Sequence, residues 1–127
     1  VRLQRYVRNV PDVAWDLFEM ATVPTTVILD GAVNLAPNLI AEDGSVALRV
    51  TEEEFSKELC YRFQKPIVST SANVSGEETA QNFRDISPEI VNAVDYVCWA
   101  RRQEHKPHKP SSIIKLTADS GITIIRK

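Results

Sequence analysis

The sequence predicts an α/β fold, and three observations support this prediction. Short runs of β-branched and apolar residues alternate along the chain with segments of helical periodicity. Residues 44–76 read as strand, helix and strand, a unit that usually packs as a right-handed crossover with ligands outside the carboxyl ends of its strands. Residues 112–126 read as two strands joined by a turn. We expect a single domain over residues 1–127.

The composition is that of a globular protein. The 127 residues are 43% apolar and 25% charged, and the net charge of −2 argues against nucleic-acid binding through a large basic surface. Cys60 and Cys98 lie in apolar or helical patterns, so we expect buried free thiols in a reducing compartment. No signal peptide or membrane span is visible, and we expect a cytoplasmic protein with no membrane partner. The chain begins at Val1 rather than Met, as a piece of a longer polypeptide would.

The first part of the chain predicts a helix followed by two strands. Asn9 can cap the helix with Pro11 near its first turn, and Pro24 ends it. The strands are rich in β-branched residues and are bounded by turn residues. The expected elements are a helix over residues 9–21, a strand over 25–29, a short helical turn within 34–43 and a strand over 45–50.

The next segment predicts a second helix. Thr51 would be the N-cap and Glu54 would reach back to it, with the acidic residues against the positive end of the helix dipole. The three carboxylates of residues 52–54 could also suggest a metal site. The apolar face that follows, as far as Gln64, favours the helix start, and we assign no metal site.

A polar loop follows this helix. Ile67 and Val68 favour a strand, and in an extended segment Ser69, Ser71 and Asn73 would line one face with two hydroxyls and one amide. Those donors suit phosphate or carboxylate oxygens. The alternative is that the serines and the amide only satisfy their own backbone, as in many turns after strands.

The second half of the chain predicts a helix capped by Ser87 and a strand over residues 95–100. Residues 101–109 form the most basic stretch. Its two histidines, His105 and His108, have no third ligand at suitable spacing, which disfavours zinc. The stretch could attract phosphates of ATP or of tRNA, or it could simply be solvated.

Several motifs resemble one known family. The stretch K-P-I-V-S-T-S-A-N-V-S-G at residues 65–76 closely resembles the S-T-S-A-N-x-S-G signature of the YrdC-like family, the threonylcarbamoyl-AMP synthases. Similar segments are P-T-T-V-I-L at 24–29, although Val23 replaces a usual glycine, and P-S-S-I-I-K-L at 110–116. Arg49 resembles the arginine of a G-x-R-x-P stretch in which Thr51 replaces the proline, and Arg126 resembles that of a closing I-x-R-x-G pattern.

The resemblance implies a fold and a binding site. The fold would be a YrdC-like twisted mixed sheet flanked by helices, incomplete at its N-terminus because two family motifs are absent from this chain. The residues that would bind ATP and L-threonine are Arg49, Ser69, Ser71, Asn73, Ser111 and Arg126. From the residues alone, a solvated Arg49 or a salt bridge to Glu52 or Glu53 is preferred over an anion contact, and the resemblance reverses that preference. No residue is assigned a catalytic role.

The implied activity is formation of L-threonylcarbamoyl-AMP from L-threonine, bicarbonate or CO2, and ATP, for threonylcarbamoyladenosine in tRNA. Mg²⁺ would accompany the ATP, and no tightly bound cofactor is expected. tRNA and tRNA-modification proteins are further candidate partners. With the N-terminal motifs absent, we expect weak or no synthase activity from this chain alone. The alternative is a YrdC-like fragment that binds nucleotide or RNA without chemistry.

Overall fold

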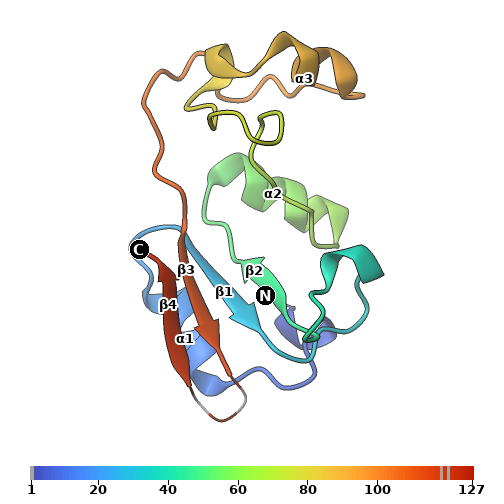
Figure 1. The fold of residues 1–127 in the computed structure, drawn as a ribbon, viewed down its shortest axis with the longest axis vertical. Helices are drawn as coiled ribbons and strands as arrows, with labels where there is room; N and C mark the ends of the chain where they lie inside the picture. The colour runs from blue at the N-terminus through green and yellow to red at the C-terminus, as the bar shows by residue number, and fades with distance from the viewer. Residues whose placement is uncertain (1, 118, 120) are drawn as a thin grey trace. The chain divides into compact units, whose positions relative to one another are not determined.

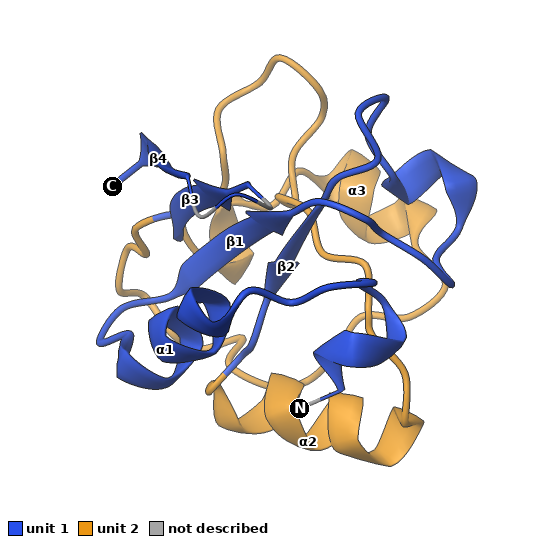
Figure 2. Cartoon of the chain, turned by 90° about the horizontal axis from the view of Figure 1, so that it is seen from below, with its two compact units in different colours: residues 1–51, 110–127 blue, residues 52–109 orange. Residues whose placement is uncertain are grey.

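The computed structural model of the protein describes residues 2–117, 119 and 121–127 (Figure 1). The chain separates into two compact units, one of Val1–Thr51 with Pro110–Lys127 and one of Glu52–Lys109 (Figure 2). We call them unit 1 and unit 2 and describe each by itself. The elements in chain order are η1 (Leu3–Arg5), α1 (Asp12–Met20), β1 (Thr25–Leu29), η2 (Pro37–Leu39), β2 (Val46–Arg49), α2 (Glu54–Phe63), η3 (Phe83–Asp85), α3 (Pro88–Ala93), β3 (Ser112–Leu116) and β4 (Ile122–Arg126).

Unit 1 is built on a four-stranded mixed sheet with the order β2-β1-β3-β4. β1 pairs antiparallel with β2 and parallel with β3, and β3 pairs antiparallel with β4. Both central strands are β-branched runs, as a strand with neighbours on each side favours. The predicted mixed sheet with flanking helices is therefore confirmed, whereas the prediction of a single domain stays a prediction.

One face of the sheet carries the hydrophobic core. Along β1 the residues alternate between buried and half-buried, with Val27 and Leu29 on the buried side together with Leu116 of β3. α1 covers this face through its buried Ala14. The remaining buried members of the core cluster are Val7 and Val46. The opposite face of the sheet carries polar side chains such as Thr26 and Lys115 together with the apolar Ile28 and Ile113.

The predicted cap of α1 is wrong. Asn9 lies outside the helix, Pro11 occupies the N-cap position, and no side chain caps the helix. The fixed backbone angle of proline suits a helix entry, and the Pro11 carbonyl accepts a hydrogen bond from the Ala14 N–H at 2.9 Å. The predicted helical turn after β1 is present as η2, and both predicted strands of this region are confirmed.

Unit 2 contains α2, η3 and α3 and has no strand among its described residues. The predicted cap of α2 is wrong: Glu53, not Thr51, is the N-cap, and its carboxylate accepts from the backbone N–H of Phe55 and of Ser56. Hydrogen bonds from Ser56 lower the pKa of Glu53. The predicted Ser87 cap of α3 is confirmed, since its hydroxyl accepts from the Glu89 N–H.

Two predicted strands of unit 2 are wrong. Residues 67–68 and 95–100 form no ladder, and the predicted strand–helix–strand unit consequently lacks its second strand. Apart from the half-buried Val97, the side chains of these runs are exposed, with 66% of Val68 and 77% of Trp99 accessible. An extended run becomes a strand only where a neighbouring strand pairs with it, and unit 2 offers none among its described residues.

The structure also bears on the two cysteines and on the predicted absence of a membrane-spanning helix. Both cysteines are free, but Cys60 is only half-buried and Cys98 is exposed, so the predicted burial is wrong. None of the helices that the structure describes is long and apolar enough to cross a bilayer.

Candidate functional site

A row of residues crosses the face of the sheet in unit 1 that lies opposite the core. Thr26 of β1 lies opposite Arg49 of β2 and beside Ile113 of β3, and Ile113 lies opposite Arg126 of β4. Residues paired in register project from the same face of a sheet. Val27, next to Thr26, belongs to the core, so the row is on the face opposite α1. The row therefore carries a guanidinium at each end and a hydroxyl between them.

Hydrogen bonds organise one end of this row. The hydroxyls of Thr26 and Ser111 lie 2.7 Å apart. Arg126 donates from Nε to the Ser111 carbonyl at 2.8 Å and from Nη2 to the Ser111 hydroxyl at 3.4 Å. These bonds use two of the five N–H donors of a guanidinium, so Arg126 is oriented and still keeps donors for an anion. We call Arg49, Thr26, Ser111 and Arg126 the anion row.

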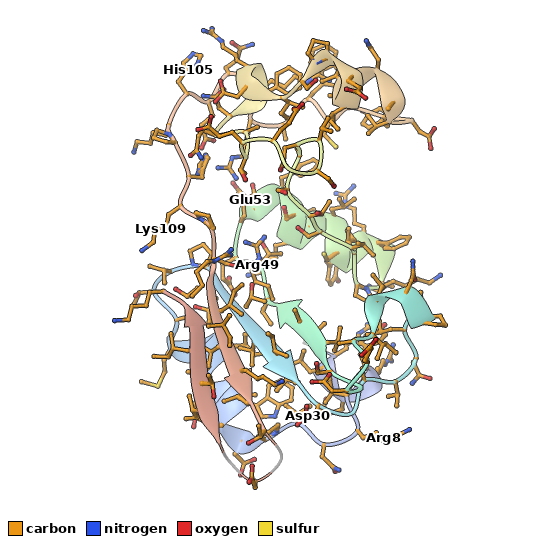
Figure 3. All side chains as sticks on the ribbon, in the orientation of Figure 1. Arg8, Asp30, Arg49, Glu53, His105 and Lys109 are labelled. Atoms are coloured by element: carbon orange, nitrogen blue, oxygen red, sulfur yellow. The ribbon has the colours of Figure 1, made fainter. Side chains whose placement is uncertain are left out.

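Arg49 is exposed at the end of β2 (Figure 3). Its candidate salt-bridge partners have other ion pairs within unit 2: Glu52 lies 3.1 Å from Lys57, and Glu53 lies 3.5 Å from Arg101. An exposed guanidinium on the same face as Arg126 gives the row two positive charges. A phosphate group is the ligand that such an arrangement of planar N–H donors suits.

A third cation on this face is already paired. Lys115 lies opposite Ile28 of β1, one row beyond the anion row, and its Nζ is 3.2 Å from Asp43. Hydrogen bonds from Ser45, whose hydroxyl lies 2.6 Å from Asp43 Oδ1, together with Lys115 lower the pKa of Asp43 to about 2. Asp43 therefore stays ionised and balances the charge of Lys115, so the net positive charge lies with the two arginines.

The polar loop of unit 2 is organised by Asn73. Its Nδ2 donates to the carbonyls of Val74 at 3.0 Å and of Glu77 at 3.3 Å, while Ser69 and Ser71 are exposed. Residues 67 and 68 form no ladder, and the expectation that the three side chains line one face of an extended segment stays a prediction. The amide donors of Asn73 bind backbone carbonyls of the same loop, which agrees with the alternative that this side chain satisfies its own backbone. The Oδ1 atom of Asn73 is buried, with no hydrogen-bond partner among the described residues.

The predicted site residues belong to different units. Arg49, Ser111 and Arg126 lie in unit 1, where Ser111 and Arg126 are in contact, and Ser69, Ser71 and Asn73 lie in unit 2. Their convergence on one pocket stays a prediction. Thr26 was not predicted as a site residue, although alternation along the strand places it on the face opposite Val27.

Three of the basic side chains of residues 101–109, those of Arg101, Arg102 and His108, have partners within unit 2. Arg101 makes a bidentate contact with Glu104 at 2.7 and 2.8 Å, and His108 Nε2 lies 2.6 Å from the same carboxylate. Arg101 is the main cause that lowers the pKa of Glu104 to about 2. Arg102 stacks on Trp99, with its guanidinium 4.0 Å from the ring centroid. Among the described residues no group of three or more His, Cys, Asp and Glu is placed to hold a metal ion.

Comparison with known proteins identifies the family. The Sua5, YciO and YrdC family model, described as telomere recombination, matches residues 2–127. A putative threonylcarbamoyl-AMP synthase from Methanocaldococcus jannaschii is 34% identical over 101 residues, which are 80% of this chain and 45% of that protein. The threonylcarbamoyl-AMP synthase of Pseudoalteromonas translucida is 32% identical over 81 residues, 64% of this chain and 43% of that protein.

The chain spans less than half the length of these relatives. No solved structure matches the chain. The family model nevertheless covers almost the whole sequence, and its match agrees with the motifs at residues 65–76 and 110–116. The chain therefore belongs to the family of Sua5, YciO and YrdC proteins.

Proposed function

We propose that the anion row binds the phosphate groups of ATP. The observation that supports this most is the ordered contact of Arg126 with Ser111, which fixes a guanidinium beside two hydroxyls. Arg49 supplies a second cation across β1. Guanidinium forks and hydroxyl donors are the groups that commonly hold phosphate oxygens.

The activity that we propose is formation of L-threonylcarbamoyl-AMP, the reaction that the names of the relatives point to. A carbamate formed from L-threonine and bicarbonate or CO2 attacks the α-phosphate of ATP, and pyrophosphate leaves. Cations fixed near the α-phosphate stabilise the charge that develops there and need no covalent nucleophile. Mg²⁺ would arrive with the ATP, because it prefers phosphate oxygens and water to an all-protein cage. The product would serve tRNA modification in the cytoplasm.

A second candidate is nucleotide binding without synthesis. The anion row contains only hydroxyls and permanent cations, with no group that titrates near neutral pH to act as a base. The Ser69 loop, which the family motif assigns to ATP and threonine, uses the amide donors of Asn73 for its own backbone. A row that binds ATP while the chain makes no product would support this candidate.

Calorimetric titration with ATP tests the proposed row. Arg126→Met and Arg49→Met should each weaken ATP binding by about tenfold, because each removes a charge-assisted contact. Arg8→Met is the matched control, since Arg8 is exposed and lies beside Gly31, beyond the opposite end of β1 (Figure 3). AMP and adenosine should bind progressively more weakly than ATP. Equal losses in all three variants, or equal affinities for ATP and adenosine, would contradict the proposal.

A further inference from the structure

The outer edge of β4 is an unprotected sheet edge. Among the described residues β4 pairs only with β3, and each of its residues is exposed. Ile122, Ile124 and Ile125 are 55 to 59% accessible. Edge strands of this kind are usually shielded by an inward-facing charge, a proline or a covering loop. In β4 the only charged residue is Arg126, at its end.

The backbone groups of two isoleucines are directed towards this free edge. The Thr117 N–H donates to the Gly121 carbonyl at 3.0 Å and the Gly121 N–H donates to the Thr117 hydroxyl at 2.9 Å, so the backbone groups of these two residues are directed towards each other across the hairpin. Such pairs alternate with non-bonded pairs along an antiparallel ladder. Ile122, opposite Leu116, and Ile124, opposite Ile114, are therefore non-bonded positions. Their N–H and C=O groups are directed away from β3.

The side chains of the same two isoleucines extend the core face. Leu116, opposite Ile122, is buried, and Ile114, opposite Ile124, packs against the core cluster. Ile122 and Ile124 continue this apolar surface to the edge, where they remain 57 and 59% accessible. The edge thus offers unpaired backbone groups and uncovered apolar side chains at the same two positions.

We propose that β4 pairs antiparallel with β4 of a second copy of this chain, which joins two four-stranded sheets into one. With Thr123 on the twofold axis, Ile122 of one copy lies opposite Ile124 of the other, so every edge-directed N–H meets a carbonyl. The four isoleucines then form one apolar strip on the core face. If the two strands were displaced by two residues from this register, one isoleucine of each copy would lie opposite Arg126 or opposite the turn of the other copy and would lose its apolar partner.

The charges at the ends of β4 also favour an antiparallel second copy. Asp119 precedes the strand, and Arg126 with Lys127 ends it. Antiparallel pairing brings the acidic end of one strand near the basic end of the other, whereas parallel pairing would bring like charges together. A register shift between Ile113 and Ile114 marks an irregularity near Ile125, which limits the new ladder to about residues 121–125.

Light scattering after size exclusion of the full chain tests this proposal. The parent chain should show a dimer whose fraction rises with concentration, and Ile124→Lys should raise its dissociation constant at least about tenfold. Met20→Lys, at an apolar residue of unit 1 that is 77% accessible, is the control and should leave the dimer intact. A parent chain that is monomeric at every concentration would overturn the proposal. So would equal changes of the dissociation constant in Ile124→Lys and Met20→Lys, provided that circular dichroism shows both variants to be folded.

Disulfide trapping tests the register. In a Cys60→Ser, Cys98→Ser background, Thr123→Cys should form a disulfide between copies, because non-bonded partners have Cα atoms about 4.5 Å apart. Ile125→Cys should form none, because residue 125 of one copy lies opposite residue 121 of the other. The two cysteines at position 125 are then separated by four residues of strand, about 14 Å. Faster trapping at residue 125 than at residue 123, or trapping at neither, would overturn the register. Neither substitution touches the anion row, so this result and the ATP result are independent.

Discussion

Replacement of Thr26 by valine perturbs the anion row at one atom. Valine keeps the shape of threonine and its β-branching but removes the hydroxyl that lies 2.7 Å from the Ser111 hydroxyl. The pair is partly buried, so its net contribution to the free energy of unfolding should be about 0.5–1.5 kcal/mol. Ser111 retains Arg126 Nη2 at 3.4 Å, which keeps the loss in the lower part of this range.

A double-mutant cycle measures this contact directly. Urea denaturation of Thr26→Val, Ser111→Ala and the double variant should show that the double variant loses about 0.5–1 kcal/mol less than the sum of the single variants. Thr25→Val is the matched control: its hydroxyl donates instead to the Val23 carbonyl at 2.9 Å, so its effect should add to that of Ser111→Ala. Additive losses for Thr26 and Ser111 would refute the reasoning that a hydrogen bond joins them.

Three further predictions concern the framework of the two units. Leu116→Ala should lower the free energy of unfolding by about 2–5 kcal/mol in urea denaturation, because Leu116 is 1% exposed in the core. Asp43→Asn should be less stable than the parent chain above pH 3.8, and this difference in stability should shrink as the pH falls from 3.8 towards 2. The reason is that the ionised Asp43 carboxylate stabilises the fold, and the parent chain loses this contribution when Asp43 is protonated. Thermal melts at several pH values check this. Glu53→Ala should cost about 1 kcal/mol and reduce helical circular dichroism, because it removes the cap of α2.

The parts of the fold that could be predicted from the sequence are those with local causes. The β-branched run of β1 ends at a turn with Gly31 at φ 76°, which a glycine adopts without strain. The hairpin of β3 and β4 needs only a short turn between two apolar runs, and the two flanking strands are confirmed. Two residues of its predicted turn, 118 and 120, lie outside the described residues.

The predictions that failed concern elements whose formation depends on contacts with other residues, which the sequence of one short segment does not specify. Residues 95–100 have the composition of a strand, but a ladder needs a neighbouring strand, and none pairs with them. At the start of α2, several acidic and hydroxyl residues could each serve as the cap. Glu53 takes that position because its carboxylate reaches the N–H groups of both Phe55 and Ser56.

The candidate site was predictable in its residue types and not in its arrangement. Motif resemblance identified Ser111 and Arg126, whose contact follows from the pairing of Ile113 with Arg126. Register between strands far apart in sequence is not visible in either strand alone, so Thr26 was overlooked. The role assigned to Asn73 depends on tertiary contacts that the motif does not contain.

The most direct test of the anion row is a titration of the ¹⁵N-labelled chain with ATP, followed by amide chemical shifts. The largest shift changes should occur at Thr26, Ile113 and Arg126, and the Arg126→Met variant should lose them at the same ATP concentrations. Shift changes confined to residues 101–109 or to the loop around Asn73, with the sheet of unit 1 unaffected, would contradict the claim that the anion row holds the phosphates.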